Sequence, residues 1–262
     1  MYQFNKPQNN VKKGVSKFMR FKDIIILFVI ILTVIFAAPQ KAFAITEQQE
    51  IEIGKQSAQK VEAQYGLWKD KNAVERLNKI GKAIADISER PNLTYSFKIL
   101  NHDGLNALAC PGGFVYVTKG AMKDVSDDEL AFVLGHEIAH VAKRHSIKQI
   151  EKATATKTGL VIMSSLFNKG KISQGNLNVI SAVNTVLSSG YSRKDERDAD
   201  ITGCHYMVKA LNANPRAAVS FMQKLKAKGK EMPGFMNSII GSHPMIDERI
   251  STLEEESKKM GY

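Results

Sequence analysis

The stretch His136-Glu137-Ile138-Ala139-His140 is the segment that we expect at the centre of the fold of this chain of 262 residues. Two histidines four positions apart lie about one turn apart on the same face of a helix, so both imidazoles can reach one zinc ion. The glutamate after the first histidine lies where its carboxylate can face a water molecule beside the metal. The motif therefore predicts a metal-binding helix that carries its own acid–base group.

The residues around this motif predict a buried helix with a defined start. Ser126 and Glu129 form a capping box, and two aspartates in the first turn complement the helix dipole. We expect this helix to run from residue 127 to about residue 145. Apolar residues surround the motif, namely Ala131, Val133, Leu134, Ile138, Ala139 and Val141. The alternative is that both histidines are purely structural. It is less well supported, because burying two histidines and a glutamate costs free energy unless a metal or other partners bind them.

A catalytic zinc site needs three protein ligands and an open position, so another ligand must come from elsewhere in the chain. Glu196 and Asp200 are four residues apart in a predicted helix over residues 193–211 and share one face of it. One carboxylate can bind the metal while the other orients a histidine. The spacing does not choose between them.

Four segments stand out in order along the chain: Asn106–Gly113, Glu129–Val141 with Arg144-His145, Tyr191–Asp200, and Ser242-His243-Pro244 with Arg249-Ile250. Together they resemble a zinc endopeptidase family. This family contains the CAAX prenyl proteases, the mitochondrial Oma-type stress protease, a bacterial inner-membrane heat-shock protease and periplasmic quality-control peptidases. The resemblance covers about residues 47–253, although Cys110 stands where the family more often has an aliphatic residue.

The resemblance implies a gluzincin-like site and assigns its residues. Zinc, one ion per chain, would bind to His136, His140 and Glu196, while Glu137 would act as the general base. Asp200 would support the ligands from behind. These assignments make the chain an expected zinc metalloendopeptidase.

His243, in the His-Pro segment of the same family, is the expected second catalytic residue. It would donate a hydrogen bond to the oxyanion that forms during hydrolysis. The alternative is a loop histidine ahead of a helix that starts near Pro244.

A small sheet is expected before the metal-binding helix. Alternating apolar residues over 93–99 predict one strand, and Phe114-Val115-Tyr116-Val117 predicts a second strand after a turn at 110–113. In the resembling family this second strand is an edge strand, to which an extended substrate can add by main-chain hydrogen bonds. Further helices are expected over 47–64, 74–90, 193–211, 215–226 and 245–258. The fold class is therefore α+β, mostly α, and the resemblance makes it a zincin-like metalloprotease domain.

Residues 1–44 have the order of a secretory signal peptide. A basic stretch ends at Lys22, a run of fifteen residues with one polar member covers Ile24–Ala38, and Ala42-Phe43-Ala44 completes a cleavage site. The alternative is an uncleaved membrane anchor, although the apolar run is shorter than a usual spanning helix. We expect residues 45–262 to be exported as one domain to the periplasm or cell envelope, with membrane association left open.

The net charge of +11 is concentrated at the amino terminus. Residues 1–44 hold seven Lys or Arg and one Asp, which leaves a formal excess of +5 over residues 45–262. Because this excess is scattered among acidic residues, nucleic acid is not an expected partner. Cys110 and Cys204 can form a disulfide or stay as two buried thiols, and the sequence does not distinguish these outcomes.

Two functions remain in competition at this stage. The favoured one is an exported zinc endopeptidase that hydrolyses unfolded or misassembled envelope proteins. The alternative is a chaperone-like binding module whose zinc site is closed by residues 150–190. The sequence does not indicate an oligomeric state.

Overall fold

The computed structural model describes residues 44–154, 190–231, 243 and 245–262, and Ile45–Tyr262 forms one compact unit. Apart from Ala44, the predicted signal segment lies outside the described residues. The prediction that residues 150–190 close the site also falls mainly outside them. Among the described residues, no helix combines the length and the hydropathy that a membrane crossing requires.

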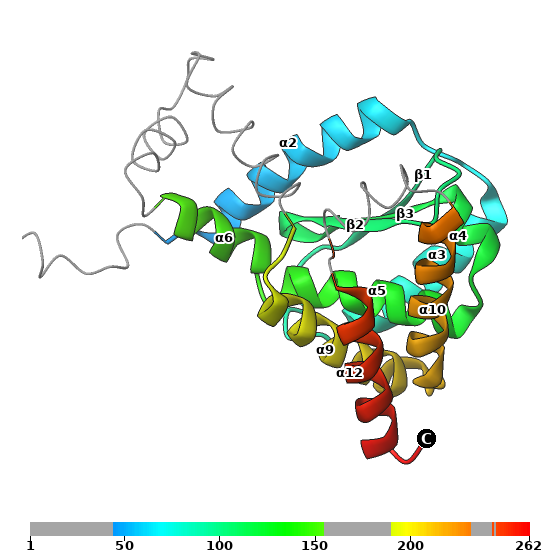
Figure 1. Ribbon diagram of the computed structural model, residues 1–262. Helices are drawn as coiled ribbons and strands as arrows, with labels where there is room; N and C mark the ends of the chain where they lie inside the picture. Colours follow the sequence, from blue (N-terminus) through cyan, green and yellow to red (C-terminus); the bar gives the residue numbers. More distant parts are fainter. Residues whose placement is uncertain (1–43, 155–189, 232–242, 244) are drawn as a thin grey trace, which may run out of the picture. The chain divides into compact units, whose positions relative to one another are not determined.

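The described residues form eight helices and one small sheet (Figure 1). Capping boxes at Thr46 and Ser126 start the first and the fourth of them, as the sequence predicts. A third box, from Ser192 to Asp195, starts the helix that carries both candidate carboxylates. The helices are α2 (Glu47–Tyr65), α3 (Lys71–Ala85), α4 (Lys119–Asp124), α5 (Asp127–Ala142), α6 (His145–Thr154), α9 (Arg193–Leu211), α10 (Arg216–Glu231) and α12 (Ile246–Lys259).

Helix α5 ends three residues earlier than its sequence predicts. Arg144 has φ +57°, a left-handed conformation that a continuing helix does not accept. A separate helix, α6, then starts at His145. Left-handed backbone usually falls on glycine, but here it falls on an arginine. The sequence therefore contains no glycine or proline that would predict the break.

The sheet has three strands in the order β1-β3-β2, with β1 at Ser96–Leu100, β2 at Ala107–Cys110 and β3 at Phe114–Thr118. Strand β3 pairs in parallel with β1 and antiparallel with β2. The prediction that Phe114-Val115-Tyr116-Val117 forms an edge strand is therefore wrong. A tight turn folds β2 back against one side of β3 while β1 occupies the other side, so β3 is central.

Helices cover both faces of this sheet, with α2 on one face and α5 on the other (Figure 1). Successive side chains of β3 alternate between the two. Tyr116 packs under α2 with Ala58, whereas Val115 and Val117 join the larger core that includes α3 and α5. The metal-binding helix therefore lies in the largest apolar cluster of the described residues.

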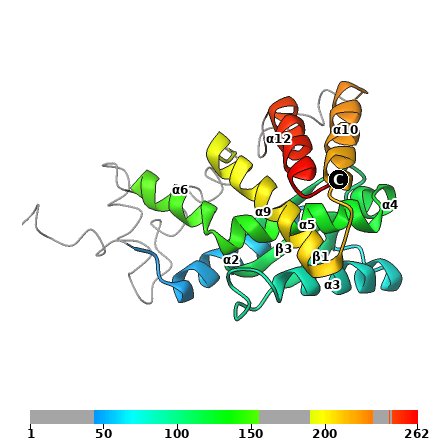
Figure 2. The same cartoon turned by 90° about the horizontal axis from the view of Figure 1, so that it is seen from below.

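Helices α5 and α9 cross at a pair of glycines, and Figure 2 shows α9 passing beside α5. A Cβ atom built on Gly203 would lie 2.6 Å from the backbone nitrogen of His136, and one on Gly135 would lie 2.7 Å from the carbonyl oxygen of Gly203. The two backbones therefore touch without side chains between them. This contact brings Glu196 and Asp200 within reach of the histidines of α5.

Both cysteines are free and fully buried, which resolves the two alternatives in favour of thiols. Cys110 packs beneath α2, whereas Cys204 lies in the main core. Burial raises the pKa of each thiol to about 12.

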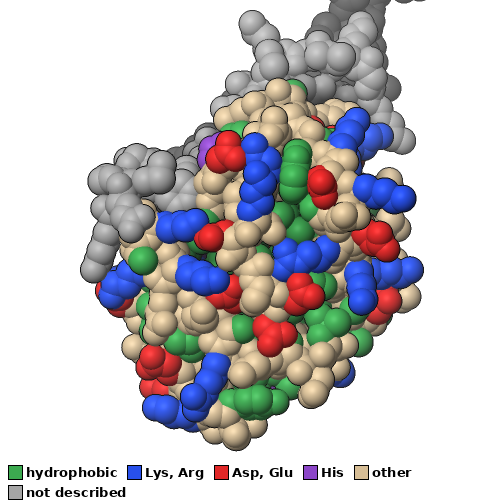
Figure 3. Space-filling model, turned by 90° about the vertical axis from the view of Figure 1, so that its right-hand side faces the viewer, with side chains coloured by type: hydrophobic (Ala, Val, Ile, Leu, Met, Phe, Trp, Pro, Cys, Tyr) green, Lys and Arg blue, Asp and Glu red, His purple; other side chains and the backbone are tan. Residues whose placement is uncertain are grey.

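The surface mixes charges of both signs. On the face shown in Figure 3, Lys and Arg side chains are interspersed with Asp and Glu. The described residues on this face form no stripe of one sign.

Candidate metal centre

The two histidines of α5 face each other in the core. The Nε2 atoms of His136 and His140 are 3.0 Å apart, and the residues are 4% and 1% exposed. Glu196 approaches from α9, with one carboxylate oxygen 3.4 Å from His140 Nε2 and the other 3.7 Å from His136 Nε2. The structure therefore brings the three predicted zinc ligands together from two crossing helices.

A third histidine completes the cluster. The Nδ1 atom of His243 lies 2.9 Å from Glu196 Oε1 and 3.3 Å from His136 Nε2. One potential ligand atom from each of these four residues falls within 4.8 Å of all the others. His243 was expected to contact the reacting group only, and the structure also places it among the possible ligands.

The chemistry of this donor set fits zinc. Imidazoles and a carboxylate are ligands that zinc prefers, and a catalytic zinc site takes three protein ligands and leaves a fourth position open. Two Nε2 atoms that face each other are held together more naturally by a shared cation than by one hydrogen bond. Beside them, Glu137 Oε2 is buried and has no hydrogen-bond partner among the described residues. An unpartnered buried carboxylate oxygen is costly, which is expected at a site built for a metal and a water molecule.

Asp200 holds His136 from behind, as the resemblance implies for a supporting residue. Its Oδ1 atom is 2.9 Å from His136 Nδ1, the ring nitrogen that points away from the cluster. Arg249 of α12 then donates two hydrogen bonds to the same carboxylate, at 2.7 and 2.8 Å. A third nitrogen of Arg249 lies 3.1 Å from Glu196 Oε2. One guanidinium therefore neutralises both buried carboxylates of α9.

His140 is held by a second set of groups that the sequence reasoning did not assign to the site. Its Nδ1 atom lies 2.9 Å from Nδ1 of His145, whose other nitrogen lies 3.4 Å from Asp198. The ring of Tyr191 stacks on His140 with 3.8 Å between centroids, and the Tyr191 hydroxyl hydrogen-bonds Ser146. The available signal was that His145, Tyr191 and Asp198 lie in the segments that resemble the family. Spacing along the sequence does not predict their contacts, because it does not predict the break after α5.

The electrostatic environment favours the ionisation states that bind a metal. Burial alone would raise the pKa of Glu196, but His243 and Arg249 outweigh it and lower that pKa well below its usual range. Burial of His140 is the largest effect on this ring and lowers its pKa well below the ordinary value. The site therefore offers an ionised carboxylate and a neutral imidazole, the forms in which both residues are zinc ligands.

The strand that the sequence assigned to substrate binding does not border the site. Val115, Tyr116 and Val117 are buried between sheet neighbours and helices. The pocket beside Glu137 is bordered instead by the start of β2 and its preceding loop, Leu105–Ala107. Among the described strands, β2 packs most extensively against α5.

The profile of peptidase family M48 matches residues 71–257, which include the whole cluster. The chain belongs to peptidase family M48. This membership confirms the predicted resemblance, the mostly helical fold with a small sheet, the zinc metalloendopeptidase class and the zinc cofactor.

Individual M48 relatives have names that agree with this assignment. The chain is 24% identical to a beta-barrel assembly-enhancing protease of Yersinia pestis over 81% of its length and 44% of the relative. It is 30% identical to the mitochondrial metalloendopeptidase OMA1 of Schizosaccharomyces pombe over 68% of its length and 51% of the relative. It is 28% identical to the metalloprotease YcaL of Escherichia coli over 83% of its length and 80% of the relative. The chain thus spans about half the length of the first two relatives and most of the third.

Proposed function

We propose that the chain is an exported zinc-dependent endopeptidase that hydrolyses peptide bonds in unfolded or misassembled envelope proteins. The observation that carries this proposal is the placement of Glu137 beside the buried cluster, with one carboxylate oxygen left without a hydrogen-bond partner among the described residues. A binding module with a closed site would have no use for such a group. The chaperone-like alternative is therefore less well supported.

Zinc would be held by His136, His140 and Glu196. When bound, it acts as a Lewis acid towards a substrate carbonyl and brings the pKa of water to about 7. Glu137 would accept the proton of the attacking water and pass it to the leaving amine. Asp200 would fix the ring of His136, so that its Nε2 atom stays directed at the metal.

His243 would stabilise the negative charge on the substrate oxygen. Burial opposes its charged form, but Glu196 and Glu137 outweigh that effect and raise the pKa of this imidazole. Its Nδ1 atom faces Glu196, while Nε2 lies 3.6 Å from Glu137 on the side of the pocket. A charged imidazole in this position can hold the carboxylate with one nitrogen and donate to an oxyanion with the other.

Substrate would bind in an extended form along β2. The backbone N–H of Ala107 donates a hydrogen bond of 2.8 Å to the side-chain oxygen of Asn106. A carbonyl group of the substrate backbone can take the place of this side chain as the acceptor. An added strand requires a substrate segment without its own tertiary structure. This requirement favours unfolded or misassembled proteins as substrates.

The proposed location rests on sequence and on one relative's name. The amino-terminal segment has the composition of a secretory signal. The relative from Yersinia pestis is called a beta-barrel assembly-enhancing protease, and we extend the envelope role that this name indicates to the present chain.

Incubation of the purified protein with unfolded casein tests the proposal. We expect fragments to form, a zinc chelator to stop their formation, and added zinc to restore it. Casein that stays intact with zinc present, or cleavage that persists in chelator, would contradict the proposed function.

A further inference from the structure

The backbone of Ile45 is held on both sides by charged side chains from a distant part of the chain. Its N–H donates a hydrogen bond of 2.9 Å to Glu151 Oε1 on α6, and its carbonyl oxygen accepts one from Arg144. The Ile45 residue is 2% exposed, whereas Ala44, just before it, is exposed. The first residue of the compact unit Ile45–Tyr262 is therefore seated in a site of its own.

The peptide bond before Ile45 is also the one at which the sequence predicts cleavage. Ala42-Phe43-Ala44 has the small residues that a signal peptidase requires ahead of its cleavage point. Hydrolysis would break the C–N bond between Ala44 and Ile45. The oxygen of water would join the carbonyl carbon of Ala44 to give a carboxylate, and both hydrogens of water would end on the Ile45 nitrogen to give an ammonium group.

We propose that the ammonium group formed at Ile45 by this cleavage pairs with Glu151, and that the ion pair fixes α6 behind the metal centre. The proposal rests on the proposed export of the chain, with removal of residues 1–44. It adds that the new amino terminus becomes a structural part of the enzyme.

The surroundings of Ile45 show why an ammonium group needs a carboxylate there. Ile45 directly precedes Thr46, the N-cap of α2, and a positive charge at that end of a helix is unfavourable. Arg144 is a further cation beside it. The carboxylate of Glu50, in the first turn of α2, is already engaged by two arginines. Glu151 is the carboxylate that contacts the Ile45 nitrogen directly, so it can neutralise the new charge.

Helix α6 carries groups that support the ligand His140. His145 is the first residue of α6, and its Nδ1 atom lies 2.9 Å from Nδ1 of His140. The next residue, Ser146, hydrogen-bonds the hydroxyl of Tyr191, whose ring stacks on His140. The position of α6 therefore determines how firmly His140 is held.

Ile45 is attached to α6 at two points. Arg144 immediately precedes the helix, and Glu151 lies further along it. Before cleavage, Glu151 accepts a hydrogen bond from a neutral N–H. A hydrogen bond between two ionised groups is roughly twice as strong as a neutral one, so cleavage would tighten the attachment of α6.

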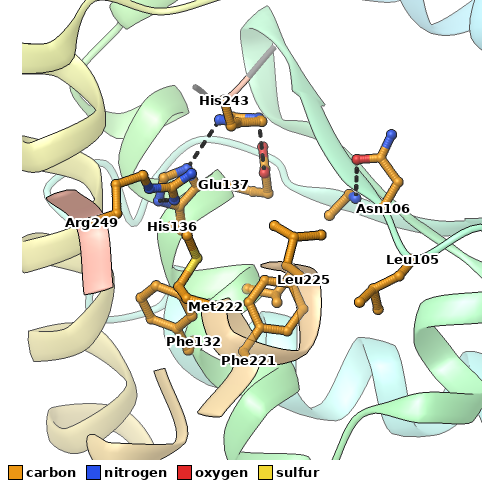
Figure 4. A pocket seen from close by; sticks show the side chains of 12 residues that line it. Leu105, Asn106, Phe132, His136, Glu137, Phe221, Met222, Leu225, His243 and Arg249 are labelled. Atoms are coloured by element: carbon orange, nitrogen blue, oxygen red, sulfur yellow. Dashed lines mark hydrogen bonds and ion pairs between the residues drawn. The ribbon is translucent and has the colours of Figure 1, made fainter. Parts of the chain in front are cut away.

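This support acts from outside the pocket at the metal centre. Figure 4 shows that pocket, with Glu137, His136 and His243 close together. None of the residues that line it belongs to α6. The effect of the ion pair is therefore expected in stability and zinc affinity, which are measured without a substrate.

The amino terminus of the exported protein is the first measurement. The full chain is produced in a bacterium that exports it, and mass spectrometry of the purified protein identifies its first residue. We expect Ile45. Retention of residues 1–44, or a different first residue, would overturn the proposal and leave the endopeptidase proposal standing.

Glu151→Gln, made in two backgrounds, isolates the charge of the ion pair. Glutamine keeps an oxygen that accepts from a neutral N–H, but it cannot pair with an ammonium group. In the processed protein we expect the melting temperature to fall by about 2–4 °C. In an Ala44→Leu background, which lacks the small residue at the cleavage point, the fall should be much smaller.

Both backgrounds are measured in the same detergent, and Glu75→Gln, at an exposed position of α3, is the control that should change neither. If Ala44→Leu protein is cleaved at another bond, it serves the same purpose, because its ammonium group is then displaced from Ile45. Equal effects of Glu151→Gln in the two backgrounds would overturn the ion pair.

Competition with a chromogenic chelator tests the link to the metal centre. In the processed protein, Glu151→Gln should weaken zinc binding, by less than the about 10 to 100-fold that direct loss of an orienting partner costs. Unchanged zinc affinity would overturn this link. Neither measurement depends on turnover, so a failure to cleave casein would contradict the proposed function without deciding this test.

Discussion

Glu196 and Asp200 lie one turn apart on α9, and each carboxylate faces a different side of the histidine cluster. Glu196 approaches the Nε2 atoms of His136 and His140, at which a metal would bind. Asp200 contacts only the outward-facing Nδ1 atom of His136. The geometry thus favours Glu196 over Asp200 as the predicted ligand, a choice that the spacing in the sequence did not make.

Matched amide substitutions test this separation. Asp200→Asn should weaken zinc binding about 10 to 100-fold, the usual cost of losing an orienting partner. Glu196→Gln should weaken it more, because a charged ligand is removed. Competition with a chromogenic chelator measures both affinities, and circular dichroism checks that the variants are folded. Equal affinities of wild type and Glu196→Gln would contradict the ligand assignment.

Glu137 is a second test at the same scale. Glu137→Gln should keep zinc at one ion per chain and lower casein hydrolysis about 10² to 10⁴-fold, because an amide cannot accept the proton from water. Metal analysis and a protease assay on the same sample measure the two effects. Glu75→Gln, at an exposed position of α3, is the control and should change neither. Loss of zinc together with activity would make Glu137 a structural residue.

At the scale of elements, the crossing of α5 and α9 sets the geometry of the site. Alanine normally stabilises a helix relative to glycine by about 1 kcal/mol. At Gly203 we expect the opposite sign, because the new methyl group would lie 2.6 Å from the backbone of α5. Separation of the helices would also move Glu196 away from the histidines.

Gly203→Ala should therefore lower both the unfolding free energy, by about 1–3 kcal/mol, and the affinity for zinc. Denaturant unfolding and chelator competition measure the two quantities. Thr202→Ala, one residue earlier on α9, is the control for a small change on this helix. A more stable Gly203→Ala protein with normal zinc affinity would show that the crossing tolerates a side chain.

Helix starts could be predicted from the sequence more reliably than helix ends and sheet order. The capping boxes at Thr46 and Ser126 are local signals and gave correct starts for α2 and α5. The end of α5 depends on the left-handed backbone of Arg144, for which the sequence has no local signal. Strand β2 was not predicted because its four residues, Ala107–Cys110, are all apolar and too few to show an alternating pattern. The central place of β3 follows from long-range pairing, so the family resemblance misled at that point.

For the site, the sequence supplied the residues and the fold supplied their partners. The spacing of His136 and His140 is enough to place both on one face of a helix. The contacts that Arg249 and His145 make there depend on how α12 and α6 pack, which a single sequence does not reveal.

At the scale of the whole molecule, metal binding should contribute to folding stability. The cluster is buried, so close contact between its polar side chains is unfavourable without a metal. Bound zinc would hold the same side chains together. Free zinc at about 100 times its dissociation constant should add about 2.7 kcal/mol to the unfolding free energy. Thermal unfolding at several zinc concentrations measures this effect, and a His136→Ala variant should show a much smaller shift. A melting temperature that is independent of zinc in the wild-type protein would contradict the site.

The two cysteines give a second measurement on the whole molecule. Both thiols are fully buried, and burial raises the pKa of each to about 12, so neither forms a reactive thiolate at neutral pH. We expect no reaction with a chromogenic disulfide reagent in the native protein and two thiols after denaturation in guanidinium chloride. A denatured protein with no reactive thiol would reveal a disulfide.

The double hydrogen bond from Arg249 to Asp200 also bears on the order in which the nascent chain can become active. During synthesis, His136, His140 and Glu196 emerge before the arginine that neutralises the carboxylates of α9. Until Arg249 follows, Asp200 cannot be buried behind His136 without a large cost. A chain that is still being synthesised would then be unable to complete the cluster. The requirement for a late residue would delay hydrolysis until α12 has been made.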